Sequence, residues 1–101
     1  MKPMYAIKFF PEVEDDLKAL DHRVRLLVFK QLNKLAQSPQ LGDLLGNKLG
    51  MDLGGCRKMY VDHKRIRIVY RILEEVIIVE VIAIAARDEM AVYREAAKRL
   101  E

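Results

Sequence analysis

The sequence predicts an α+β fold: an N-terminal strand, a helical hairpin, a three-stranded antiparallel meander and a short C-terminal helix. Three patterns support this prediction: alternating side chains at residues 4–10, helical periodicity over residues 11–37, and strand-like runs joined by short turns between residues 56 and 86. At 101 residues, 51% of them hydrophobic, the chain suits one core. We therefore expect a single domain, residues 1–101, with a mostly antiparallel four-stranded sheet.

The first strand and the helical hairpin are predicted from local signals. Apolar and polar side chains alternate over residues 4–10, as expected for a strand. Pro11 suits the first turn of a helix that runs to about Leu20, and the acidic residues after it complement the helix dipole. A second helix begins near Asp21, a residue type favoured at the N-cap, and stops before Pro39. The apolar faces of this hairpin must cover a sheet.

The remaining elements follow a glycine-rich segment. Residues 40–55 contain all five glycines and are predicted to form a loop. Strand-like runs follow at residues 56–61, 64–73 and 76–86. The short turns between them, at Asp62-His63 and Glu74-Glu75, favour an antiparallel meander. Residues 88–100 place apolar side chains at helical spacing and predict a closing amphipathic helix.

Composition excludes several classes of protein. Cys56 is the only cysteine, so no intrachain disulfide forms, and His22 and His63 lack the spacing of metal ligands. We therefore expect neither a metal site nor a cofactor. The N-terminal residues are too charged for a signal peptide, and no apolar run approaches the ~18 residues of a membrane span. The expected location is the cytoplasm.

The positive charge of the chain is concentrated in one segment. The formal net charge is +3, but residues 56–73 carry six Lys or Arg and one Asp, so the rest of the chain is net negative. A local excess of this kind is typical of an electrostatic contact surface rather than of general solubility.

Strand periodicity assigns these charges to a face. If a turn of two or four residues joins the first two basic strands, even positions pair with odd ones. One face then carries Lys58, Tyr60, Arg65, Arg67 and Arg71. The other face is apolar apart from Arg57. The cationic face suits a phosphate backbone and unstacked bases, but a solvated face on which Glu80 neutralises Arg67 or Arg71 explains the pattern equally well.

Several segments, taken together, carry a resemblance to a known family. They are NKL (47–49), CRKMYV (56–61), RIRIVYRI (65–72), VIAIAARDEMAVY (81–93) and REAAKRL (94–100). In this order they resemble the RelE-like toxins of the RelE/ParE superfamily of type II toxin–antitoxin systems. The similarity covers nearly the whole chain and is continuous from Cys56 onward.

The resemblance implies a function and partners. RelE-like toxins are mRNA interferases: metal-independent endoribonucleases that cut mRNA in the ribosomal A site, with the 2′-hydroxyl as nucleophile, and so inhibit translation. The implied partners are the ribosome, mRNA and a cognate RelB-like antitoxin, with no membrane. Two other readings stay open: a gyrase poison without nuclease chemistry, as in the ParE branch, and a catalytically weakened relative that only binds antitoxin or RNA.

The resemblance also implies site residues. The expected catalytic residues are Lys58, Tyr60, Arg67, Arg87 and Tyr93, and the expected RNA- or phosphate-binding residues are Lys64, Arg65 and Arg71. Attack on phosphorus requires charge stabilisation and proton transfer, which Arg, Lys and Tyr side chains supply. Tyr60 departs from the family, which carries a second lysine there. A phenol has an unperturbed pKa of ~10, close to that of lysine, so substitution is chemically possible.

Two of these residues also have structural interpretations. Tyr93 lies on the apolar stripe of its predicted helix, which is typical of a core residue. Arg87, just past the last strand, is positioned to cap the sheet or to pair with Asp88 or Glu89.

Overall fold

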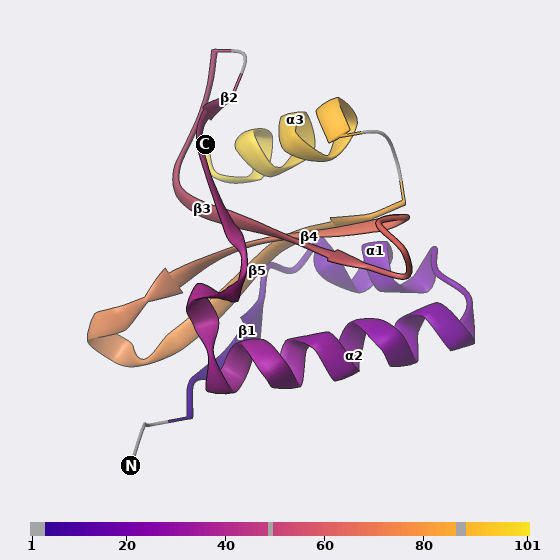
Figure 1. Ribbon diagram of the computed structural model, residues 1–101. Coiled ribbons are helices and arrows are strands. Elements are labelled where there is room, and N and C mark those ends of the chain that lie inside the picture. Colours follow the sequence, from indigo (N-terminus) through magenta and orange to yellow (C-terminus); the bar gives the residue numbers. More distant parts are fainter. Residues whose placement is uncertain (1–3, 49, 87–88) are drawn as a thin grey trace.

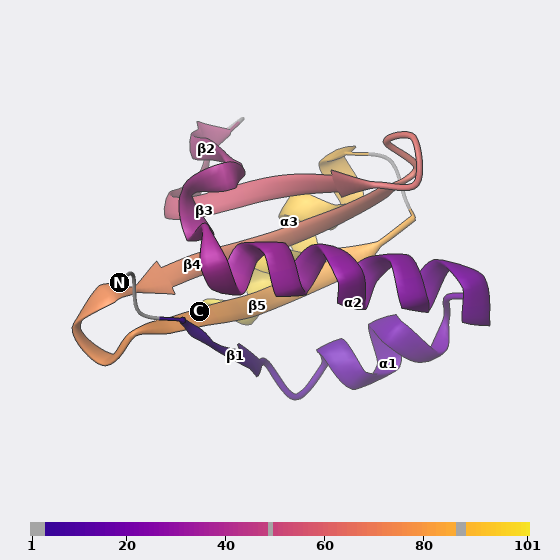
Figure 2. The same cartoon turned by 60° about the horizontal axis from the view of Figure 1, so that its bottom comes forward.

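The computed structural model describes residues 4–48, 50–86 and 89–101, which form three layers. Helices α1 and α2 cover one face of a five-stranded sheet and α3 lies on the other (Figures 1 and 2). The elements are β1 (Ala6–Phe9), α1 (Val13–Lys18), α2 (His22–Gln37), β2 (Asp43–Lys48), β3 (Met51–Val61), β4 (Ile66–Leu73), β5 (Ile78–Ala85) and α3 (Glu89–Arg99). Short 3-10 turns at Pro39–Leu41 and Glu74–Val76 complete the chain.

The sheet confirms the predicted α+β class and the antiparallel meander. The strand order is β1-β5-β4-β3-β2, in which β1 pairs with β5 in parallel and every other pair is antiparallel. The predicted count of four strands is wrong, because β2 and the first half of β3 occupy the segment predicted as a loop. Its glycines supply positive φ angles within a paired hairpin: Gly46 (φ 65°) lies at the irregularity of β2, and Gly55 (φ 82°) lies within β3.

The helical hairpin forms close to the predicted positions. The Asp21 carboxylate accepts a hydrogen bond from the Val24 amide at 2.9 Å, which confirms Asp21 as the N-cap of α2. Helix α2 ends at Gln37, before Pro39 as predicted. Helix α1 is shorter than predicted, because it begins at Val13 and ends at Lys18.

The β3–β4 pairing has the predicted parity. A four-residue turn, residues 62–65, joins the strands, and Tyr60 lies directly opposite Arg67. The apolar face packs against α2 through Ile68 and Tyr70, both fully buried.

The cationic face is less open than predicted. Helix α3 covers its centre, where Cys56 and Val69 are buried together with Val92 and Tyr93 of the helix. Lys58, Lys64 and Arg67 lie toward the end of this face next to the β3–β4 turn, and Arg71 lies toward its other end. The predicted cations are therefore divided between the two ends of the face.

Candidate functional site

Strands β3 and β4 bring three of the predicted site residues together. Lys58 and Tyr60 are two residues apart on β3 and so point to the same face, and Arg67 faces Tyr60 from β4. All three are half-buried, so each has a fixed stem and an accessible end. Lys64 reaches the same place from the turn.

Tyr60 is the centre of this group. The Lys58 Nζ donates a hydrogen bond to the Tyr60 hydroxyl at 3.1 Å and lies 5.1 Å from the centroid of the ring. The Arg67 Cζ lies 5.2 Å and the Lys64 Nζ 5.8 Å from the same centroid. These distances are within the range of cation–π attraction, which holds three cations around one ring. We call Lys58, Tyr60, Lys64 and Arg67 the Tyr60 cluster.

The cluster has the donors that a phosphodiester requires. A guanidinium such as that of Arg67 matches two phosphoryl oxygens with its planar fork, and an ammonium such as that of Lys58 supplies a point charge and N–H donors. The Tyr60 oxygen accepts the hydrogen bond from Lys58, and a phenol hydroxyl is by its chemistry also a proton donor. The cluster thus combines charge stabilisation with a hydrogen-bonded Lys–Tyr pair along which a proton can move.

The other predicted residues are placed differently. Arg71 lies about 13 Å from Arg67 along β4, four residues at ~3.3 Å each. Its Nε donates to Glu80 at 2.6 Å and its guanidinium lies 5.7 Å from the Phe10 ring centroid. The cross-strand neutralisation by Glu80 considered from the sequence is therefore confirmed for Arg71. Arg65 is exposed in the β3–β4 turn.

Tyr93 is in the core beneath α3, with 2% of its surface exposed, as the apolar stripe indicated. Contact with a substrate would require this helix to shift. Arg87 lies outside the described residues.

Sequence reasoning missed an ion pair beside the cluster. Arg23, in the first turn of α2, donates to both oxygens of Asp62, at 3.3 and 3.1 Å. The Arg23 hydrogen bond lowers the pKa of the Asp62 carboxyl and raises that of the guanidinium. These residues are 39 positions apart, so no local pattern connects them.

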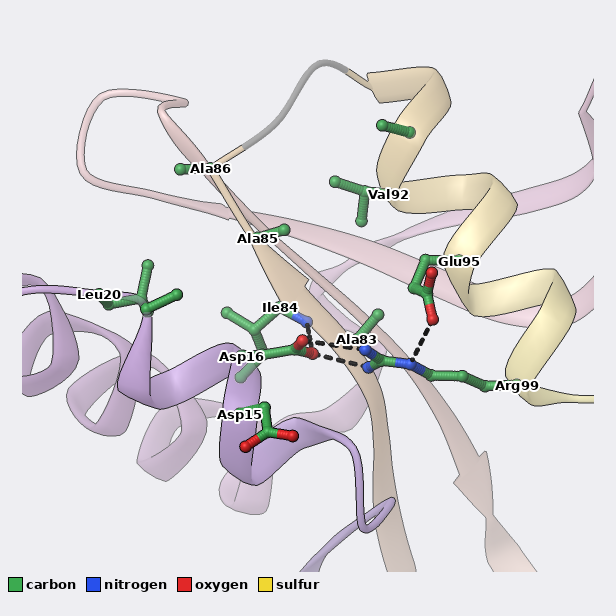
Figure 3. A pocket seen from close by; sticks show the side chains of 12 residues that line it. Asp15, Asp16, Leu20, Ala83, Ile84, Ala85, Ala86, Val92, Glu95 and Arg99 are labelled. Carbon is green, nitrogen blue, oxygen red and sulfur yellow. Dashed lines mark hydrogen bonds and ion pairs between the residues drawn. The ribbon is translucent and has the colours of Figure 1, made fainter.

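A separate cavity of about 430 Å³ lies between α1, β5 and α3 (Figure 3). The Arg99 guanidinium binds both oxygens of Asp16, at 2.6 and 2.9 Å, and also donates to Glu95 at 3.2 Å (Figure 3). The hydrogen bond to Asp16 raises the pKa of Arg99. Because Asp16 and Arg99 neutralise each other, this cavity lacks the cationic excess of the Tyr60 cluster.

Helix length gives one further result. Among residues 4–48, 50–86 and 89–101, no helix is long and apolar enough to cross a membrane.

Comparison with known proteins agrees with the fold. Residues 7–91 match the family model described as the ParE toxin of the type II toxin–antitoxin system parDE. The mRNA interferase toxin RelE of Escherichia coli K12 is 29% identical over 96 residues, which cover 95% of this chain and 97% of that protein.

Solved structures of E. coli RelE have a similar fold. An arginine-to-alanine double mutant of E. coli toxin RelE in the free state has a TM-score of 0.78 and 26% identity, covering 97% of this chain and 99% of that one. The same mutant in complex with a peptide of the antitoxin RelB has a TM-score of 0.71 and 25% identity, covering 92% and 94%. The chain therefore belongs to the ParE toxin family of type II toxin–antitoxin systems and is a RelE-like member of the RelE/ParE superfamily.

Proposed function

We propose that this chain is the toxin of a type II toxin–antitoxin system and that it cleaves mRNA in the ribosomal A site, which stops translation. The observation that supports this most directly is the Tyr60 cluster, in which three cations surround one tyrosine at an accessible end of the sheet. Relatives named mRNA interferase RelE, similar over nearly the whole chain, support the same activity.

The proposed reaction is an in-line displacement at phosphorus. The 2′-oxygen forms a bond to phosphorus, the bond to the 5′-oxygen breaks, and the products are a 2′,3′-cyclic phosphate and a 5′-hydroxyl. Arg67 and Lys58 stabilise the charge that develops on the phosphoryl oxygens. Tyr60 gives its proton to the departing 5′-oxygen and regains one from the Lys58 ammonium, to which it is already hydrogen-bonded.

The proton of the attacking 2′-hydroxyl needs a separate acceptor. Lys58, Lys64 and Arg67 are donors, and the Tyr60 oxygen already accepts from Lys58. We assign this acceptor to water or to a group that the ribosome brings to the A site, which gives the ribosome a chemical role besides presentation of the codon. Arg87 as a second phosphate clamp and Tyr93 as a base-orienting residue remain parts of the proposal.

The proposed partners follow from the same relatives. E. coli RelE has been solved with a RelB peptide and in an intact RelBE toxin–antitoxin complex. A RelB-like antitoxin is the corresponding partner here, and the cytoplasm, where ribosomes translate, is the corresponding location.

A second candidate function is favoured by the match to the ParE family model. In that case the protein poisons DNA gyrase, and the Tyr60 cluster contacts a partner surface without cutting RNA. Loss of a cluster cation should abolish toxicity if the protein is a nuclease. It should leave much of the toxicity if the protein is a gyrase poison.

Primer extension on a defined mRNA in a cell-free translation reaction tests the proposal. We expect cuts in the A-site codon with wild-type protein and ribosomes, none on naked mRNA, and none with Lys58→Ala. Lys30→Ala removes an exposed lysine from α2 and serves as the matched control, with wild-type cutting expected. Intact mRNA in the presence of folded wild-type protein would reject nuclease activity and favour the gyrase assay.

A further inference from the structure

The turn between β3 and β4 has an unusual backbone for its composition. Asp62, His63 and Lys64 all have positive φ, at 55°, 56° and 67°, and none is glycine. The left-handed region is costly for residues with a Cβ, and Lys is less tolerant of it than Asp. Three such residues in succession persist only if surrounding contacts hold them in place.

Arg23 provides such a contact. Its two terminal nitrogens bind the two oxygens of Asp62, the fork-to-fork geometry that fixes orientation as well as distance. The Asp62 side chain is only 8% exposed, whereas that of Arg23 is 63% exposed, so the carboxylate is enclosed and the arginine reaches over it from outside.

The position of Arg23 is unfavourable for α2 itself. A cation in the first turn of a helix opposes the helix dipole, and the Asp21 carboxylate at the N-cap is the acidic group that offsets part of this cost. The bidentate contact with the turn, rather than the stability of α2, explains why an arginine occupies this position.

The turn carries part of the candidate site. Lys64, the last of the three strained residues, places its Nζ 5.8 Å from the centroid of the Tyr60 ring. Lys58 and Arg67 reach Tyr60 from paired strands, but Lys64 reaches it only through the conformation of the turn. Whatever fixes that conformation also fixes the third cation of the cluster.

We propose that Arg23 is a positioning residue: through Asp62 it holds the strained β3–β4 turn so that Lys64 faces a phosphate bound at Tyr60. This inference rests on the proposed function for the role of the phosphate. The placement of Lys64 by Arg23 depends only on the geometry of the turn and not on the proposed reaction.

A double-mutant cycle tests the inference. Arg23→Gln and Lys64→Gln should each lower kcat for ribosome-dependent cleavage about tenfold, and the double variant should be no slower than Lys64→Gln alone, because Arg23 acts through Lys64. Asp62→Asn, which keeps a side chain that tolerates positive φ, should match Arg23→Gln. Arg25→Gln removes an equal charge from the same helix and should leave kcat within about twofold. Multiplicative losses in the double variant would overturn the inference.

An NMR measurement separates this inference from the proposed function. A cross-relaxation peak between the Lys64 ε-methylene and the Tyr60 ring should be present in wild type and Arg25→Gln and lost in Arg23→Gln, with the remaining spectrum that of the folded protein. Its persistence in Arg23→Gln would overturn the inference. If wild type cleaves no RNA, the proposed function fails, and this peak alone decides whether Arg23 places Lys64.

Discussion

At the scale of single residues, Tyr60 stands where the resemblance to RelE-like toxins leads us to expect a lysine. Its hydroxyl accepts from Lys58 and keeps its own proton, so the pair can replace a lysine as proton donor. We expect Tyr60→Phe to bind programmed ribosomes normally but to cleave about 100-fold more slowly, the usual contribution of a positioned acid. Single-turnover cleavage measures this loss, and Tyr60→Lys should restore most of the rate. A Tyr60→Phe variant with the wild-type rate would exclude tyrosine from proton transfer.

The Tyr60 cluster also shows which contacts residue patterns can predict and which they cannot. Strand alternation was enough to put Lys58, Tyr60 and Arg67 on one face, because β3 and β4 pair with the predicted parity. The position of Lys64 beside Tyr60 depends on positive φ angles in the turn. Strand periodicity does not predict these angles. Likewise, periodicity gave Arg71 the same face as Arg67 but could not choose which of them pairs with Glu80.

At the scale of elements, β2 was missed because glycine was interpreted as a loop signal. Gly42, just before β2, is required for a close approach: a Cβ there would stand 2.5 Å from the Tyr70 hydroxyl and 2.6 Å from the Lys58 carbonyl oxygen. The Tyr70 hydroxyl accepts from the Gly42 amide at 2.8 Å and donates to the Pro39 carbonyl at 2.7 Å. A tyrosine on β4 thereby fixes the start of β2, which composition alone does not predict.

This contact predicts a dependence of stability on alkaline pH. Burial raises the pKa of Tyr70, so the folded state holds its proton more tightly than the unfolded chain, whose value is ~10. The stabilisation is fully present below pH ~10 and is lost as the pH rises toward the folded-state pKa. In urea unfolding, Tyr70→Phe should be about 1–2 kcal/mol less stable than wild type at pH 8, with a smaller difference above pH 10. An equal difference at both pH values would contradict this.

At the scale of the whole molecule, Asp16 and Arg99 join all three layers. β1 ends at Phe9, so in the part of the chain that the structure describes β5 has no neighbouring strand beyond Val81 on that side. Asp16 accepts from the Ile84 amide at 3.0 Å (Figure 3). Arg99 donates to the Ile82 carbonyl at 2.8 Å. An ion pair between helices thus satisfies the open edge of the sheet. The partners are 83 residues apart, which places this contact beyond any local sequence signal.

The Asp16–Arg99 pair joins two helices and also binds two backbone groups of β5. Its removal should therefore lower the free energy of unfolding more than removal of an exposed ion pair does. Arg99→Gln leaves a mostly enclosed carboxylate, with 15% exposure, and should cost about 3 kcal/mol of unfolding free energy. Lys18→Gln, which breaks the exposed Glu14–Lys18 pair, should change it by less than about 0.5 kcal/mol and is the matched control.

Replacing a buried ion pair by two apolar residues is often neutral. Here Asp16→Leu/Arg99→Leu should remain destabilised, because two backbone groups of β5 lose their partners. Urea unfolding of the four proteins measures all these differences, and a double variant as stable as wild type would show that the pair contributes nothing to the sheet edge.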